Sequence, residues 1–544
     1  MKVNYDGKSY EVAVNTTFEE FMIKNDIHKK YDISAVLVNN NLKELSEVIH
    51  DGDSVEFLDL LDKDARNIYM RTLSFAFLVA LKKFDENAIC TIEHSLSNGL
   101  FCNIKNSSSQ VNRAYTQSIK DEMEKLIKEK KPIVKYKLPF NQASRIYNMQ
   151  SEHKKEGLLG YRDTEDTVPI YGLDGYKNYF YGYMLPNTSY LNKFDLRIYN
   201  AGIVLLGPDI KNPDKVTEFR NQPRLFAIYQ EAKDWADVIK MPTALELNHA
   251  IENGQYHDII RYTEAYHEKK ICDIVNQIVR ENKRIILVAG PSSSGKTSFA
   301  QRLKIQLVAS KKYPVSISMD NYYIDRDKNL TNDFESINAL DIEKFNEDLN
   351  NLLEEKEVEL PIYDFITGTR KKEGILTSVG KDQPIIIEGI HGLNPILTES
   401  ISAVYKYRIY VSELTQLNLD NHNRISTTDV RLIRRIIRDN AHRGYGAELT
   451  LSMWDKVNEG ERNNIFVFQE NADTMFNTAL IYEIAAMKKY IEPLLKAIDK
   501  NSIYYKEAKK ILKFTKYFLS IEDESDIPNT SILREFIGGS KLVD

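Results

Sequence analysis

Short runs rich in apolar residues recur in the second half of the chain. One covers residues 285–289, a second covers 315–319 and a third covers 384–387. Runs of this length, bounded by glycine, proline or polar residues, are typical of strands that are buried on both faces. An amphipathic segment at 299–307 follows the first run and has helical spacing. The pattern therefore predicts alternating strands and helices in a doubly wound parallel sheet.

The first 60 residues follow another pattern, in which apolar and polar residues alternate. A turn at Asp6-Gly7 joins two such stretches, which indicates a hairpin. Thr16 and Thr17 each have a glutamate three residues on, which is the capping-box signature of a helix start. The predicted order is ββαββ, with strands at 3–5, 10–14, 35–38 and 55–58. This order resembles the TGS domain, a β-grasp module at the front of threonyl-tRNA synthetases and some GTPases.

Residues 61–240 resemble the second N-terminal domain of threonyl-tRNA synthetase, on the segments 69–82 and 91–104. That domain edits with a His-x-x-x-His pair and a Cys-x-x-x-His pair. Here the first pair is replaced by Arg71 and Phe75, and the second by Phe180 and Met184. We therefore expect an α+β domain that holds no catalytic zinc and serves in binding or as a scaffold. His94 remains, and a lone histidine is expected to be a hydrogen-bonded structural residue.

Helical spacing dominates residues 241–283, with apolar positions such as Leu245, Ile271 and Ile278 on one face. The chain is thus predicted to be a multidomain α/β protein. Its expected parts are a TGS-like β-grasp domain at 1–60, a synthetase-like domain at 61–240, a helical connector at 241–283, a P-loop domain at 284–500 and a C-terminal helix and tail at 501–544.

Composition narrows the functional classes. The 544 residues are 42% hydrophobic and 28% charged, with a net charge of −6. An acidic balance gives no global attraction to nucleic acid or anionic membranes. The start of the chain has no apolar signal region, and no stretch approaches the ~18 apolar residues of a membrane span. We therefore expect a cytoplasmic protein without membrane contact, whose three cysteines are buried thiols.

The strand at 285–289 runs into Gly290-Pro291-Ser292-Ser293-Ser294-Gly295-Lys296-Thr297-Ser298, which fits the phosphate-binding P-loop between a strand and a helix. The glycines allow a tight turn, and the backbone N–H groups and the helix N-terminus attract phosphate. Lys296 is expected to reach the β/γ-phosphates and Thr297 to bind Mg²⁺. The sequence therefore predicts binding of a nucleoside triphosphate with Mg²⁺.

Two carboxylates follow the other predicted strands. Asp320 comes directly after the run at 315–319, and Glu388 comes directly after the run at 384–387 in a pattern that resembles a Walker B strand. Ligands bind at the carboxyl ends of parallel strands, so both should face the phosphates. Asp320 is the candidate general base, and helix capping is its structural alternative. Glu388 is a candidate Mg²⁺ ligand, because hard cations prefer oxygen.

Five arginines occur within thirteen residues, at 431, 434, 435, 438 and 443. Helical spacing places the first four on one face, where they are expected to bind anions. Guanidinium groups bind phosphate bidentately and stabilise charge on a transferring phosphoryl group. A solvated basic helix or an RNA-binding stripe is the alternative.

The collinear order of P-loop, Asp320, a Tyr-Asp-Phe segment at 363–365, Glu388 and the arginines resembles the uridine kinase and phosphoribulokinase family over about 284–490. The resemblance implies that Asp320 is the base, that Glu335 holds the ribose hydroxyls and that Tyr363 lines the nucleoside pocket. It also implies that Arg435 approaches the acceptor and that Arg438 and Arg443 belong to a lid over the phosphates.

The chain departs from that family where the base is read. Gly368 stands where uridine kinases carry a histidine after Tyr-Asp-Phe, and Tyr445 stands where a further arginine is expected. The stretch 451–455 also differs. The leading hypothesis is an ATP-dependent kinase that phosphorylates a nucleoside 5′-hydroxyl with relaxed acceptor choice. The alternatives are a phosphoribulokinase-like kinase of sugars or sugar phosphates, and an RNA- or ribosome-associated nucleotide-binding protein that contacts RNA through residues 1–240.

Overall fold

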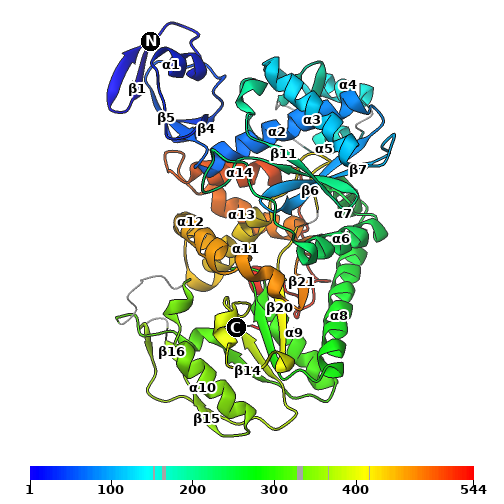
Figure 1. Cartoon of the computed structure of the whole chain (residues 1–544), viewed down its shortest axis with the longest axis vertical. Coiled ribbons are helices and arrows are strands. Elements are labelled where there is room, and N and C mark those ends of the chain that lie inside the picture. The colour runs from blue at the N-terminus through cyan, green and yellow to red at the C-terminus, as the bar shows by residue number, and fades with distance from the viewer. Residues whose placement is uncertain (151–152, 162–166, 328–334, 365–366, 416, 544) are drawn as a thin grey trace.

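The computed structural model describes all residues except 151–152, 162–166, 328–334, 365–366, 416 and 544. Figure 1 shows a small β-rich region at the N-terminus and a larger α/β region beside it. A long helix, α8, leads from there to a sheet flanked by helices at the opposite end. Among the described residues, no helix has the length and apolar character needed to cross a membrane.

The chain opens with the hairpin and the capped helix that the sequence predicts. Thr17 accepts a hydrogen bond from the N–H of Glu20, whose side chain accepts one from the N–H of Thr17, so the capping box is complete. The strands form a mixed sheet in the order β2-β1-β5-β3-β4, and β4 is a short strand that the sequence did not predict. The elements are β1 Lys2–Tyr5, β2 Lys8–Glu11, α1 Phe18–Lys24, β3 Ile33–Val38, β4 Asn41–Lys43 and β5 Asp53–Asp59.

The second region packs a buried helix, α2, against two antiparallel sheets. One sheet has the order β11-β12-β7-β6 and the other β10-β9-β8. Its helices are α2 Lys63–Phe84, α3 Arg113–Lys128, α4 Phe140–Met149 and α5 His153–Leu159. Its strands are β6 Ile89–Leu96, β7 Gly99–Lys105, β8 Ile133–Leu138, β9 Val168–Leu173, β10 Tyr176–Tyr179, β11 Asp195–Tyr199 and β12 Gly202–Leu206.

Three helices connect this region to the parallel sheet: α6 Pro223–Val238, α7 Ala244–Glu252 and α8 Tyr256–Arg280. The apolar positions that predict them, including Leu245, Ile271 and Ile278, are buried. The helical character expected for 241–283 is therefore confirmed.

A five-stranded, all-parallel sheet in the order β14-β19-β13-β20-β21 forms the core of the C-terminal half. Every residue of β13 is buried, as expected for a central strand covered on both faces. The strands are β13 Ile285–Ala289, β14 Val315–Ser318, β19 Ile385–Glu388, β20 Lys406–Ser412 and β21 Thr474–Asn477. Short hairpin strands project from it: β15 Val358–Leu360, β16 Tyr363–Asp364, β17 Thr369–Arg370 and β18 Ile375–Thr377.

Seven α-helices of the described residues accompany the sheet in the C-terminal half of the chain. They are α9 Lys296–Ala309, α10 Ile342–Leu353, α11 Thr427–Arg443, α12 Ala447–Asn464, α13 Glu483–Lys496, α14 Tyr505–Thr515 and α15 Arg534–Ile537. One apolar cluster contains Tyr147 of α4 together with Ile433 of α11 and Phe514 of α14. In Figure 1, α14 lies between the N-terminal regions and α13. The second region and the C-terminal half therefore share a core.

Candidate phosphoryl-transfer site

The P-loop lies between β13 and α9, as the sequence predicts. A Cβ on Gly290 would stand 1.8 Å from the carbonyl oxygen of Val411, so only glycine fits there. Gly295 has a φ of +81°, which glycine adopts without strain, and it caps α9. The Lys296 ammonium donates to the carbonyl of Pro291 at 3.1 Å. Because α9 begins directly after Gly295, the N–H groups of its first turn form an anion-binding site at the end of the P-loop.

The two candidate metal residues are in direct contact. The Thr297 hydroxyl donates to Oε1 of Glu388 at 3.2 Å. The register of the sheet explains this, because Glu388 ends β19 and is paired with Val288 of β13, just before the P-loop. A hydroxyl and a carboxylate side by side are a donor set that suits a hard cation.

Asp320 lies at the same edge of the sheet. Ser318, the last residue of β14, is in register with Glu388, and Asp320 follows it in a short 3₁₀ helix, Met319–Tyr322. Burial raises the pKa of Asp320, and Lys296 opposes that rise. Burial also raises the pKa of Glu388 to about 7; Lys296 opposes that rise, and Asp320 and Glu535 add to it. The two carboxylates and the lysine therefore form one electrostatic cluster.

The arginine helix α11 does not present four arginines to an anion, which corrects the expectation from helical spacing. Arg431 pairs with Glu461 at 2.6 and 2.8 Å, and Arg434 pairs with Glu483 at 2.6 Å. Both arginines are almost fully buried. The anions that these two positions require are supplied by the protein itself.

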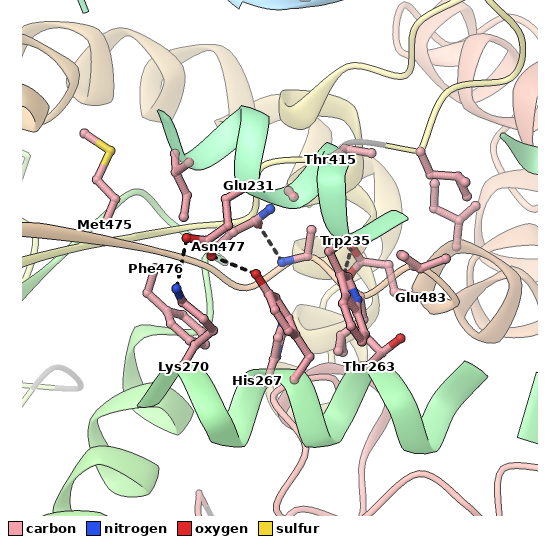
Figure 2. A pocket seen from close by; sticks show the side chains of 18 residues that line it. Glu231, Trp235, Thr263, His267, Lys270, Thr415, Met475, Phe476, Asn477 and Glu483 are labelled. Atoms are coloured by element: carbon pink, nitrogen blue, oxygen red, sulfur yellow. Dashed lines mark hydrogen bonds and ion pairs between the residues drawn. The ribbon is translucent and has the colours of Figure 1, made fainter. Parts of the chain in front are cut away.

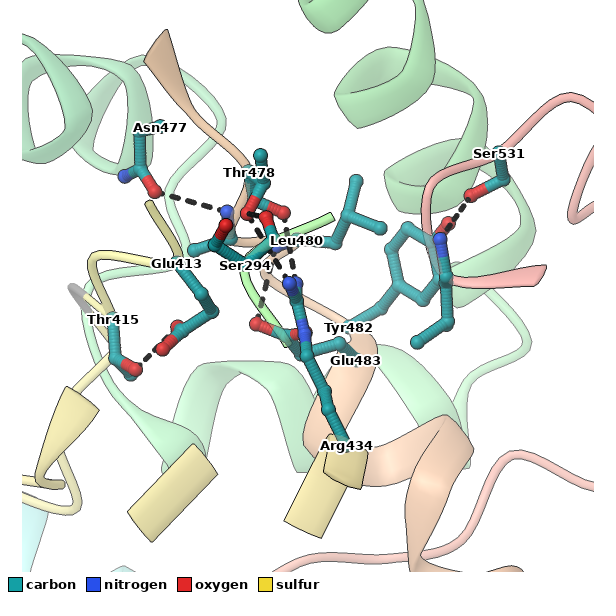
Figure 3. A network of polar contacts seen from close by, with 12 residues as sticks. Ser294, Glu413, Thr415, Arg434, Asn477, Thr478, Leu480, Tyr482, Glu483 and Ser531 are labelled. Atoms are coloured by element: carbon teal, nitrogen blue, oxygen red, sulfur yellow. Dashed lines mark hydrogen bonds and ion pairs between the residues drawn. The ribbon is translucent and has the colours of Figure 1, made fainter. Parts of the chain in front are cut away.

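These pairs hold the P-loop in place. Figure 3 shows Arg434 between Glu483 and Thr478. The Thr478 hydroxyl in turn donates to the carbonyl of Ser294 in the P-loop at 2.7 Å. Glu461 accepts the N–H of Ser292 at 2.8 Å and thereby joins the other side of the loop to α12. The loop is therefore fixed by two buried ion pairs that sequence reasoning did not find.

The remaining arginines lie nearer the site. Arg435 donates to the Ser292 hydroxyl of the P-loop at 2.8 Å. Arg438 has Asp439 at 3.7 Å and Glu535 at 3.9 Å, and burial lowers its pKa. Arg443 contacts Asp439 at 3.1 Å, and its side chain is 49% exposed.

Tyr363 lies beside the candidate base. Its N–H donates to Asn321, the residue after Asp320, at 3.2 Å, and its ring lies 5.7 Å from that of Tyr323. Glu335 packs against α12, because a Cβ on Gly460 would stand 2.6 Å from the Cβ of Glu335. Residues 333–334 beside it lie outside the described residues.

Comparison with known proteins agrees with this geometry. The model of the phosphoribulokinase / uridine kinase family matches residues 285–484. A uridine kinase from Mycoplasma pneumoniae is 34% identical over 181 residues, which are 32% of this chain and 76% of that protein. The chain belongs to the phosphoribulokinase/uridine kinase family. Its C-terminal half is an ATP-dependent kinase with a parallel-sheet P-loop fold.

Other relatives match the same part of the chain. A uridine kinase from Mycoplasma genitalium is 28% identical over 228 residues, which are 40% of this chain and 97% of that protein. Among solved structures, a possible uridine kinase from Bacillus stearothermophilus covers 38% of this chain and 98% of its own length. Its sequence identity is 18% and its TM-score is 0.26.

Position 368, which corresponds by sequence resemblance to the base-contacting histidine of uridine kinases, has a backbone that favours glycine. Gly368 has a φ of +72°, and a Cβ there would stand 2.9 Å from the Nε of Arg326. Its carbonyl accepts the N–H of Arg326 at 2.8 Å. Replacing Gly368 with histidine would strain the loop, so that substitution does not test base selectivity.

In the second region, Phe75 and Phe180, two of the four positions compared with the editing residues, are in contact. The rings of Phe75 and Phe180 lie 5.2 Å apart, and the Thr72 hydroxyl contacts the Met184 sulfur at 3.6 Å. The part of the chain that the structure describes contains no cluster of three or more His, Cys, Asp or Glu residues that could hold a metal.

His94 is structural but not hydrogen-bonded, which corrects part of the expectation. Its ring stacks 4.1 Å from Tyr229, and neither ring nitrogen has a partner among the described residues. Burial lowers the pKa of His94 to about 3, so the ring is neutral at neutral pH. Cys90 and Cys102 are buried thiols, whereas Cys272 is partly exposed.

Figure 2 shows a small pocket between α6, α8 and β21 with the segment that follows it, and Trp235 and His267 are among the residues that line it. Its volume of about 50 Å³ is well below the 300–1,000 Å³ of typical ligand sites, so it is a packing gap rather than a substrate site.

Proposed function

We propose that the protein transfers the γ-phosphoryl group of ATP to the 5′-hydroxyl of a nucleoside. The observation that carries the proposal is the convergence of Asp320 and Glu388 beside Lys296, at the carboxyl ends of β14 and β19 next to the P-loop. Relatives named uridine kinase cover the same residues. The acceptor class follows from those names and from the positions of Tyr363 and Glu335.

We assign a role in phosphoryl transfer to each group of site residues. The P-loop, Gly290–Ser298, and the Lys296 ammonium bind the phosphates, with backbone N–H groups at the start of α9 as donors. Asp320 orients the acceptor hydroxyl and takes its proton, and a pKa raised by burial makes it a better base than an exposed aspartate. Arg435 approaches the acceptor, and Arg438 and Arg443 neutralise charge on the transferring group.

Magnesium fits the site through oxygen donors. Thr297 and Glu388 would hold it, and a cation nearby would favour the charged form of the buried Glu388 carboxyl. Mg²⁺ in such kinases is held by one or two carboxylates plus substrate phosphates, so a cluster of three acidic ligands is not required. When bound, it neutralises charge on the phosphate oxygens.

Two classes of acceptor are considered, a nucleoside and a sugar phosphate. A glycine at 368 provides no polar side chain to read a base, so discrimination among nucleosides is expected to be weak, about tenfold or less in kcat/KM. A sugar-phosphate kinase is the alternative, and it would need cations for the acceptor's own phosphate.

ADP release across a panel of nucleosides and sugar phosphates tests the proposal. We expect release with nucleosides in wild type and none in Lys296→Ala, with a 5′-monophosphate as the product. Release with a sugar phosphate alone would transfer the assignment to the alternative. ATP-independent, steeply salt-dependent RNA binding without acceptor-dependent release would favour the RNA-associated function.

For the front of the chain, we propose a TGS-like domain at 1–60 and a synthetase-like scaffold at 61–240 without deacylating activity. The aromatic and thioether side chains at the positions of the editing residues support this, because zinc requires three or four N, S or O ligands.

A further inference from the structure

The C-terminal segment, residues 528–538, reaches the P-loop. Ile532 lies against Gly295, where an added Cβ would stand 2.4 Å from its methyl group. Phe536 lies under the Arg434 guanidinium at 5.0 Å. Ile532 and Phe536 are fully buried, so the segment is part of the packed structure rather than a loose tail.

This segment places a carboxylate on the phosphate-binding end of α9. Oε2 of Glu535 accepts the Ser298 hydroxyl at 2.7 Å and the Ser298 N–H at 3.3 Å. Ser298 is the last residue of the P-loop and lies in the first turn of α9, whose N–H groups have no partner within the helix and are donors to phosphates. Glu535 therefore uses donors that a nucleotide phosphate would need.

The same carboxylate faces the arginine helix. Oε1 of Glu535 lies 3.9 Å from Arg438, which is a proposed lid residue. The Glu535 side chain therefore contacts both Ser298, a phosphate-binding donor, and Arg438, a cation proposed to bind the phosphates. Two anions cannot share the Ser298 donors, because their charges repel at hydrogen-bond distance.

We propose that the Glu535 carboxylate competes with the nucleotide phosphates for the donors of Ser298. Nucleotide binding displaces this carboxylate from Ser298 and frees Arg438 to turn towards the phosphates. This inference rests on the proposed nucleotide site. It assigns residues 528–538 a role in setting nucleotide affinity, and it requires only a movement of this segment relative to α9. Glu535 acts through Ser298 and Arg438, so it is a positioning residue.

Calorimetric titration of the full chain with MgADP tests the proposal. Glu535→Gln keeps the shape and removes the charge, and we expect ADP to bind about tenfold more tightly, which equals about 1.4 kcal/mol. Glu522→Gln is the matched control, because Glu522 lies nearby in the chain and its side chain is exposed. The control should bind ADP as wild type does.

Hydrogen exchange of wild type provides a readout that does not depend on a variant. The peptide that covers residues 528–538 should exchange faster with MgADP than without it. Unchanged or weaker ADP binding by a folded Glu535→Gln variant, or slower exchange in this peptide, would overturn the inference while leaving the nucleotide site intact. Absence of ADP binding in wild type and both variants would overturn the nucleotide site itself, and the inference with it.

Discussion

Several carboxyl groups around the P-loop are buried, and their neighbours determine their charge. Burial raises the pKa of Glu413 to about 8; Glu483 adds to that rise, and Arg434 and Arg431 oppose it. Thr415 donates to this carboxyl at 2.5 Å, as Figure 3 shows. Glu413 is therefore expected to be protonated in the folded protein at neutral pH.

This gives a prediction about stability and pH. A carboxyl with an unfolded pKa near 4.5 and a folded pKa near 8 binds more protons when folded. Its contribution to stability is full below the unfolded value and is lost as the pH rises towards 8, by up to about 1.4 kcal/mol per pH unit. Thermal unfolding of wild type should occur at lower temperature at pH 8 than at pH 6.5. Glu413→Gln should flatten that dependence, and an equally steep dependence in the variant would exclude Glu413 as the cause.

At the residue scale, local motifs could be predicted from the sequence and distant partners could not. The P-loop and Glu388 follow strands whose ends must meet at one sheet edge, and Thr297 does contact Glu388. Glu535 lies 237 residues from Ser298, and no local pattern connects them. The left-handed backbone at Gly368 was likewise hidden, because a glycine in a sequence is compatible with either sign of φ.

Among the helices, α11 shows why the role of its arginine face was predicted incorrectly. Helical spacing correctly indicated that its arginines need anions. The partners of Arg431 and Arg434 are glutamates 30 and 49 residues further on, in α12 and α13. Spacing within one helix says what a face requires but not which element supplies it.

Breaking the pair between α11 and α13 should be costly. Glu483→Gln leaves the buried Arg434 charge without its carboxylate, and we expect a loss of about 3–5 kcal/mol in the free energy of unfolding, measured by urea titration. Glu492→Gln on the same helix is the control, because its i,i+4 partner Lys496 is 63% exposed and the pair should contribute under about 1 kcal/mol. Similar losses in both variants would show that the buried pair does not secure α11.

At the scale of the whole molecule, the kinase half is not separate from the front of the chain. Lys506 of α14 pairs with Asp64 of α2 at 3.0 Å, and Lys510 pairs with Asp429 of α11 at 2.7 Å. The Tyr517 hydroxyl bonds to the hydroxyl of Tyr179 in β10. Hydrophobic patterns identified the separate regions along the chain. Contacts between two regions could not be predicted in this way, because they produce no periodic pattern in the sequence of either region.

We therefore expect that removing residues 1–240 exposes the apolar cluster shared by α4, α11 and α14. The remaining chain should aggregate or unfold at lower temperature than the full chain, which size-exclusion chromatography and calorimetry would detect. A monodisperse fragment with the thermal stability of the full chain would show that the shared core is not needed.

We propose that Asp320, just after the end of β14 and beside Lys296, is the base of the phosphoryl-transfer site. Single-turnover transfer from γ-labelled ATP to a nucleoside tests it most directly. Asp320→Asn should bind ATP nearly as wild type does and transfer at least ~10²-fold more slowly, whereas the exposed control Asp327→Asn should transfer at the wild-type rate. Equal transfer rates in Asp320→Asn and wild type would contradict the claim.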